Sequence, residues 1–398
     1  MGKSTKTRAR PVRARRRRLL IGGGVALAAV PALWLCIQHV PGFGPALADG
    51  ARALVGPGPV AWAEDVAYGA ADRLALVSRS DEPPKTYWET PATPAQAAGD
   101  TPAAAPPSDG APPPYEPPFR NVAARGDGTW TAMSDAALAG APSAMWKSLV
   151  HPDPKRSWAA VAIVAIDLSR IDLHVMAGTV EPYNKHVPRE QRPGIIPTAQ
   201  HADLLAVFNG GFKATHGHYG MMVDGVSILP PRDIACTVGF FRDGAVRIGT
   251  WSDMKEREGE LRAYRQAPPC LVEEGSTHKA LSFEYNRDWG AAVGGETVIR
   301  RSAIGIDQSG RTLFYALGDA VTARSLAGAL VAAGARNAAQ LDINQSYPRF
   351  LQYDKASPGE PPKAKCGLIP ELVFTTWEYV SESSPRDFFY LTRKKSAS

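Results

Sequence analysis

The stretch SAIGIDQSGRTLFYAL, residues 302–317, decides the fold class of this chain. Two apolar runs rich in β-branched and aromatic residues, 302–306 and 312–317, flank the polar segment DQSG at 307–310. Short apolar runs separated by a turn that contains glycine are typical of a β-hairpin. We therefore expect two antiparallel strands here.

Working outward, residues 322–335 (TARSLAGALVAAGA) place Leu326, Leu330 and Val331 on one face of a helix, with Gly334 near its end. Most other apolar runs are too short for helices and lie beside turn signals. The sequence predicts an α+β fold with a mixed, largely antiparallel sheet and few helices. Further hairpins are expected at 158–176, 221–229 and 237–248, and single strands at 204–208, 337–343, 372–376 and 388–391.

The positive charge of the chain is concentrated at its N-terminus. Residues 1–18 contain nine Lys or Arg and no acid, and removing them leaves 36 basic against 39 acidic residues, a balance of −3. Because the basic excess is confined to this tail, we expect no nucleic-acid partner. An uncharged run at 19–37 follows, close to the roughly 20 residues that span a bilayer.

This arrangement predicts an N-terminal transmembrane signal-anchor at 19–40, with 1–18 in the cytoplasm and the main domain periplasmic or extracellular. Ala46-Leu47-Ala48 resembles a signal peptidase site, so cleavage after Ala48 stays open. We interpret 41–82 as a juxtamembrane segment, and 83–120 as a Pro/Ala-rich linker because 12 prolines lie between 83 and 118. The folded domain is expected at 126–398.

Three cysteines lie beyond the apolar run, Cys236, Cys270 and Cys366, and their spacing matches no zinc pattern. An odd number allows at most one disulfide among them and leaves one thiol over. The sequence does not decide which two pair.

Candidate site residues cluster at strand ends. The paired glycines of FNGGFKATHGHYG (208–220) suit either an anion cradle or a tight turn. His216 and His218, on one side of the loop if it is extended, suit hydrogen bonding or a metal. Only Asp224 lies close enough in sequence to add a ligand, so we expect no metal and no cofactor. Asp342 interrupts an apolar strand, where an unpaired acid is costly to bury.

Five short motifs occur in a characteristic order: NGGF at 209–212, VDG at 223–225, RSAIGI at 301–306, AGA at 333–335 and LDINQS at 341–346. On these motifs, residues 160–353 resemble the phosphodiester glycosidase family. The resemblance implies hydrolysis of a sugar-1-phosphodiester at the anomeric carbon, with a phosphate-linked glycan as substrate.

The resemblance also implies roles for particular residues. Asp342 would be the carboxylate that activates water or steadies the oxocarbenium-like carbon, with Asp224 as second candidate. His216 or His218 would donate hydrogen bonds to the sugar or the phosphate. Residues expected around the phosphate are Asn209, Gly210, Gly211 and Arg301.

One departure from the family pattern leaves the activity open. Where relatives carry three glycines after the acid, this chain has Ile343, Asn344 and Gln345 before Ser346. Either the side chains of Asn344, Gln345 and Ser346 replace the lost backbone donors, or hydrolysis is lost. The alternatives to a hydrolase are a non-catalytic protein that binds an anionic glycan of the envelope, and a metal-dependent phosphodiesterase that uses the two histidines and Asp224.

Overall fold

The computed structural model describes residues 47, 50, 51, 54–89, 110–135, 142–282, 289, 297–343, 346–357 and 359–395. Residues 64–398 form one compact unit, which contains all the β-sheets. The predicted span at 19–40 lies outside the described residues. Within the described ranges, no helix combines the length and the apolar character needed to cross a bilayer.

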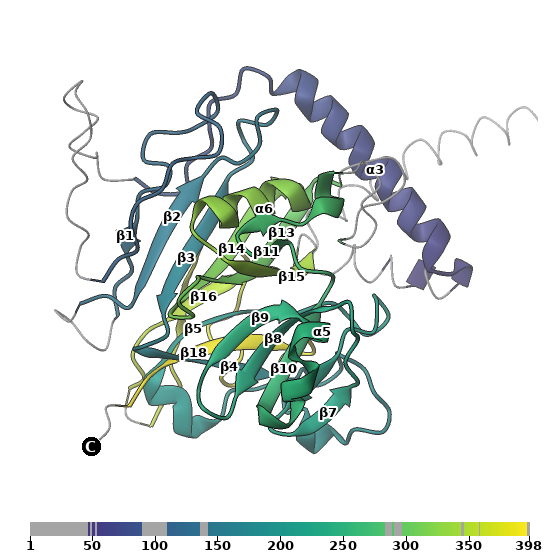
Figure 1. Cartoon of the computed structure of the whole chain (residues 1–398), viewed down its shortest axis with the longest axis vertical. Helices are drawn as coiled ribbons and strands as arrows, with labels where there is room; N and C mark the ends of the chain where they lie inside the picture. The colour runs from purple at the N-terminus through teal and green to yellow at the C-terminus, as the bar shows by residue number, and fades with distance from the viewer. Residues whose placement is uncertain are drawn as a thin grey trace, which may run out of the picture. The chain divides into compact units, whose positions relative to one another are not determined.

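The largest sheet has eight strands and contains the hairpin from which the fold class was predicted (Figure 1). All its pairings are antiparallel. In spatial order its strands are β1 (Thr131–Ala132), β2 (Met145–Val150), β3 (Val161–Asp167), β14 (Thr312–Val321), β13 (Ile299–Ile306), β15 (Asn337–Ile343), β11 (Val272–Glu273) and β12 (Ser276–Thr277).

Two five-stranded antiparallel sheets complete the β structure. The first has the order β7 (Val226–Leu229), β6 (Met221–Val223), β10 (Leu261–Ala267), β8 (Cys236–Phe241) and β9 (Val246–Thr250). The second has the order β17 (Ala364–Gly367), β16 (Phe350–Tyr353), β5 (Leu204–Asn209), β18 (Phe388–Arg393) and β4 (Ile171–Met176).

Helices are few in the described part of the chain, as expected for an α+β fold. The Thr322 side chain accepts a hydrogen bond from the Ser325 amide and caps α6, the helix predicted from its apolar face. The α-helices are α3 (Pro57–Ser78), α5 (Trp251–Met254) and α6 (Ala323–Ala332). The 3-10 helices are η1 (Arg189–Gln191), η2 (Thr198–Asp203), η3 (Lys255–Glu260) and η4 (Lys279–Ser282).

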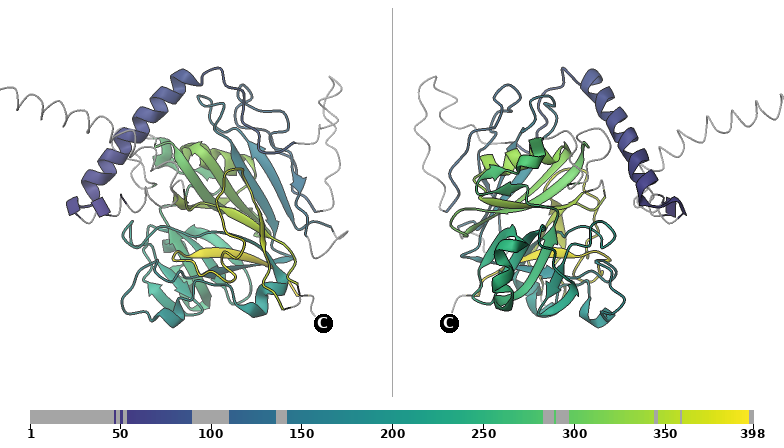
Figure 2. Two further views of the ribbon diagram at one scale, coloured as in Figure 1. Left: turned by 180° about the vertical axis from the view of Figure 1, so that it is seen from behind. Right: turned by 45° about the vertical axis from the view of Figure 1, so that its right-hand side comes forward.

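The apolar core forms two layers on the two faces of the large sheet. One face carries alternate residues such as Ala303 and Phe314, which pack with Leu326 and Leu330 of α6. The other face, which includes Ile304, packs against side chains of both five-stranded sheets. Figures 1 and 2 show α6 on one side of the large sheet and the two smaller sheets on the other. The helix and the small sheets therefore bury opposite faces of the same strands.

Three predicted hairpins are confirmed: β13–β14, β6–β7 and β8–β9. The hairpin predicted over 158–176 is wrong, because β3 and β4 belong to different sheets. β3 is hydrogen-bonded to β2 on one side and β14 on the other, which leaves no edge for β4. The predicted strand 372–376 is not formed, and Val373 within it is 70% exposed. The strands that were not predicted are β1, β2, β10, β11, β12, β16 and β17.

Parts of the predicted juxtamembrane segment and linker contact the domain. The helix α3 begins at Pro57, a position at which proline is well tolerated because the first turn does not need an amide donor. Asp72 of α3 forms an ion pair with Arg156 at 2.6 Å. Within the proline-rich stretch, the Tyr115 hydroxyl donates to Ser148 at 3.1 Å. Residues of the predicted juxtamembrane segment and of the predicted linker therefore form contacts with the domain.

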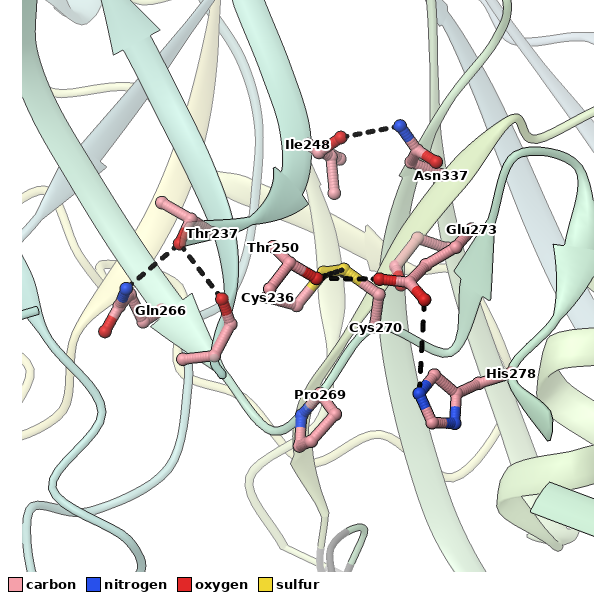
Figure 3. The surroundings of a disulfide bond; sticks show 12 residues. Cys236, Thr237, Ile248, Thr250, Gln266, Pro269, Cys270, Glu273, His278 and Asn337 are labelled. Atoms are coloured by element: carbon pink, nitrogen blue, oxygen red, sulfur yellow. Dashed lines mark hydrogen bonds and ion pairs between the residues drawn. A yellow bond between two sulfur atoms is a disulfide. The ribbon is translucent and has the colours of Figure 1, made fainter. Parts of the chain in front are cut away.

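One disulfide joins Cys236 at the start of β8 to Cys270, which follows β10, and Cys366 is a free thiol. Both bonded cysteines are fully buried. Figure 3 shows the disulfide together with two hydrogen bonds that connect neighbouring sheets. Thr250 donates to Glu273 at 2.7 Å, and Asn337 donates to the carbonyl of Ile248 at 2.8 Å. The disulfide therefore stands where the β8–β10 sheet meets β11 and β15.

Reduction of this disulfide is expected to lower the free energy of unfolding by roughly 3–4 kcal/mol, because the bond closes a loop with a sequence separation of 34. Urea unfolding of the full chain with and without reductant measures the effect. The Cys366→Ser variant should show the same loss as the unaltered chain. An unchanged unfolding midpoint under reduction would contradict the prediction.

Candidate active site

The Asp342 carboxylate, near the end of β15, is paired with a guanidinium from a distant part of the chain. Arg386 donates to Asp342 Oδ2 at 2.5 Å, and the Ile343 amide donates to Oδ1 at 2.9 Å. The Asp342 side chain is 4% exposed and that of Arg386 12%. Asp342 is thus buried but compensated, as the cost of burying a lone carboxylate requires.

Arg386 was not predicted from the sequence, where the available signal was an Arg-Asp pair directly before the apolar run of β18. Besides Asp342, its guanidinium donates to the carbonyl of Gly211 at 3.0 Å. It lies 4.4 Å from the ring centre of Tyr347, a cation–π distance. Its buried Nε has no hydrogen-bond partner among the described residues. The guanidinium therefore retains donor capacity beyond the carboxylate that it binds.

The two glycines of the predicted anion cradle point their amides at Asp387. The Gly211 amide donates to Asp387 Oδ2 at 2.9 Å and the Gly210 amide to the Asp387 carbonyl at 3.0 Å. A Cβ on Gly210 would overlap the Asp387 side chain, and one on Gly211 would lie 2.7 Å from the Arg265 guanidinium. The pair therefore serves close backbone approach, and in this structure both amides are used within the protein.

Asp387 holds this turn through a second ion pair. Its carboxylate accepts from Arg265 Nε at 2.8 Å, and both side chains are at most 1% exposed. Because the Asp342 amide donates to the Gly210 carbonyl at 3.1 Å, the turn that Asp387 fixes also supports the backbone of Asp342.

Asn209, also predicted near the phosphate, is fully buried and hydrogen-bonded. Its amide group donates to Ser302 at 2.8 Å, and its carbonyl oxygen accepts from the Tyr315 hydroxyl at 2.8 Å and the Arg349 amide at 3.2 Å. These bonds join β5 to β13 and β14. They give Asn209 a positioning role at the end of β5.

Arg301 lies apart from Asp342. Its neighbour Ser302 bonds to Asn209, and successive side chains of a strand point to opposite faces. The Arg301 guanidinium accordingly lies on the α6 side of the sheet, 99% buried, where it donates to Gln340 Oε1 at 3.0 Å and to the Val321 carbonyl at 3.1 Å. The predicted meeting of Arg301 and Asp342 is not found, and Arg386 stands at that carboxylate instead.

The two histidines lie in a tight turn, not in an extended loop. The His216 amide donates to the Lys213 carbonyl and the His218 amide to that of Ala214, both at 2.9 Å, and His218 has a φ of 50°. Both residues are exposed. The charge of His216 acts to lower the pKa of Asp342, against the larger effect of burial.

The remaining predicted residues are more remote or undescribed. Asp224 is exposed in the β6–β7 turn with a φ of 48°, and no described hydrogen bond or ion pair joins it to Asp342. Asn344 lies outside the described residues, and Ser346 is exposed. In the ranges that the structure describes, no group of three or more His, Cys, Asp and Glu side chains is arranged to hold a metal ion.

Burial sets the acidity of the central carboxyl. Desolvation raises the pKa of Asp342 above the ordinary aspartate value, although Arg386 and the Ile343 amide act in the opposite direction. A carboxylate with a raised pKa is a stronger base than a solvated one. The Asp342–Arg386 pair therefore combines a proton acceptor with a cation suited to phosphate oxygens.

The chain thus folds into an antiparallel β domain in which a buried acid lies beside a guanidinium. Residues 202–342 match the sequence model of the phosphodiester glycosidase family, which confirms the resemblance predicted from the motifs. No curated protein sequence matches the chain significantly.

Two solved structures match parts of this chain. One is the catalytic domain of zebrafish N-acetylglucosamine-1-phosphodiester α-N-acetylglucosaminidase, auto-inhibited by its pro-peptide, with 14% identity, a TM-score of 0.41, and coverage of 67% of this chain and 89% of that one. The other is a hypothetical protein from Synechocystis, with 12% identity, a TM-score of 0.34, and coverage of 63% and 62%. At such scores these likenesses add nothing about the chemistry of the site.

Proposed function

We propose that this chain is a hydrolase that cleaves a sugar-1-phosphodiester at the anomeric carbon. One observation carries the proposal: the family match ends at Asp342, and the carboxylate of that residue is buried against Arg386. Arg386 was absent from the predicted site, and it supplies the positive charge that had been expected from Arg301.

The chemistry follows from what these two side chains offer. Water adds its oxygen to the anomeric carbon, the bond from that carbon to the phosphate oxygen breaks, and its electron pair leaves with the phosphate. The Asp342 carboxylate takes the proton of the attacking water. Arg386 stabilises the negative charge on the phosphomonoester that departs. The leaving group is a stable anion, so no strong acid is required on that side.

We further propose that the domain acts outside the cytoplasm on a phosphate-linked glycan of the envelope, tethered through residues 19–40. The basic tail before an uncharged run supports this orientation. The buried Cys236–Cys270 disulfide supports an oxidising compartment.

An assay of purified full-length protein tests the function. UDP-linked and aryl-phosphate-linked sugars are offered, and released free sugar and phosphomonoester are measured, with and without a chelator. Release that survives chelation supports the proposal. Release abolished by chelation favours the metal-dependent phosphodiesterase, and binding of the phosphodiester without any release favours the non-catalytic glycan-binding protein.

The raised pKa of Asp342 predicts the pH dependence. The ionised base is lost as pH falls through that pKa, so kcat/KM should decline on the acid side with a midpoint above the roughly 3.9 of an ordinary aspartate. A profile of kcat/KM against pH measures it. An acid limb centred at or below the ordinary value would show that Asp342 is not the titrating base.

A further inference from the structure

A cavity of about 310 Å³ is lined in part by the segment that leads into Arg386. Its size is at the low end of the roughly 300–1,000 Å³ typical of small-molecule sites. None of the site residues predicted from the sequence lines this cavity. Its lining residues are Arg349, Val373, Phe374, Thr375, Glu378, Glu382, Ser383, Ser384 and Pro385.

The cavity is joined to the candidate active site through short chain connections. Ser384 and Pro385 immediately precede Arg386, and the Ser384 hydroxyl accepts from the Arg386 amide at 3.1 Å. Arg349 donates from Nε to the carbonyl of Tyr347 at 3.3 Å, and the Tyr347 ring stacks on the Arg386 guanidinium. The same two segments therefore form a wall of the cavity and hold Arg386 at Asp342.

The charge of the lining argues against a phosphate in the cavity. Arg349 is bound to Glu378 at 2.5 Å and to the Ser346 carbonyl at 2.5 Å, so its charge is already compensated. Glu382, which accepts from the Thr375 hydroxyl at 2.5 Å, adds a second carboxylate. With two acids against one base, an anionic group would be repelled.

The same lining suits an uncharged sugar. Carboxylate oxygens accept hydrogen bonds from sugar hydroxyls, the Ser383 hydroxyl can donate or accept, and the Thr375 hydroxyl, which donates to Glu382, can still accept. The half-buried ring of Phe374 and the exposed side chain of Val373 add apolar surface for the carbon-bound face of a sugar. The cavity thus offers acceptors and an apolar wall without net positive charge.

We propose that this cavity binds a neutral sugar unit of the substrate, next to the phosphodiester held at Arg386. The inference rests on the proposed function, because it makes the substrate a glycan with at least one uncharged sugar beside the linkage that is cleaved.

Binding of neutral sugars to the full chain tests this without requiring turnover. Saturation-transfer NMR is run with methyl α-mannoside, methyl α-glucoside and N-acetylglucosamine. Ser383→Trp places a bulky ring at an exposed position of the lining, and Ser381→Trp, also exposed but outside the lining, is the matched control. We expect at least one sugar to bind, about tenfold more weakly to Ser383→Trp and unchanged to Ser381→Trp.

The outcomes separate the cavity from the catalytic proposal. If none of the three sugars binds, or if Ser383→Trp binds as well as the unaltered chain, the cavity inference is overturned, even where phosphodiester hydrolysis is found. If inorganic phosphate competes with the bound sugar for the cavity, the charge argument fails as well. If sugar binding depends on Ser383 but no phosphodiester is cleaved, the cavity site stands and the hydrolase proposal fails.

Discussion

The Asp342→Asn variant is expected to lose turnover of sugar-1-phosphodiesters by about 10²–10⁴-fold. The amide has nearly the shape of the carboxylate but only one acceptor oxygen, so it can keep one of the two hydrogen bonds, that from Arg386 or that from the Ile343 amide. What disappears is the base that takes the proton from water. Initial rates of sugar release, with circular dichroism as a check on folding, measure the change.

Asp224→Asn is the control for this experiment, because Asp224 is the alternative carboxylate and is exposed in the β6–β7 turn. Its rate should match that of the unaltered chain. A folded Asp342→Asn protein with full activity, or a loss confined to Asp224→Asn, would transfer the catalytic role away from Asp342.

The Asp387→Ala variant is expected to lower the free energy of unfolding by about 3–5 kcal/mol, the usual cost of removing one partner from a buried ion pair. The substitution leaves the Arg265 guanidinium, which is 1% exposed, without its carboxylate. It also leaves the Gly211 amide without its acceptor. Urea unfolding of the full chain measures the loss.

The surface pair Arg257–Glu260 provides the comparison, since exposed ion pairs contribute little. Glu260→Ala should leave the unfolding midpoint nearly unchanged. Equal effects of the Asp387 and Glu260 substitutions would show that the Asp387–Arg265 pair does not hold the glycine turn.

The sequence predicted those parts of the fold that depend on residues close together in the chain. The alternation and turn residues of 302–317 specify a hairpin because both strands and their connection are contiguous. The hairpin predicted for β3 and β4 failed because pairing with β2 and β14 outcompetes pairing with the next strand along the chain. Adjacent strands pair by default, but a fully buried strand takes the partners that cover both its edges.

The candidate site was predicted in part for the same reason. The strand ends at Asn209 and Asp342 were found because a polar residue that closes an apolar run is visible in the sequence. The partners of these residues were not. Gly211 and Asp387 are 176 residues apart, and no periodicity relates them.

The sequence by itself determined the short strands, the capped helix, the order of the family motifs and the charge of the N-terminal tail. These depend on residues close together in the chain. The tertiary structure decided which side chains meet: Arg386 rather than Arg301 beside Asp342, and Asp387 rather than a ligand at the paired glycines. The register of β13 against β15 shifts between Arg301 and Ala303, and strand pairing of this kind sets the face to which each side chain turns.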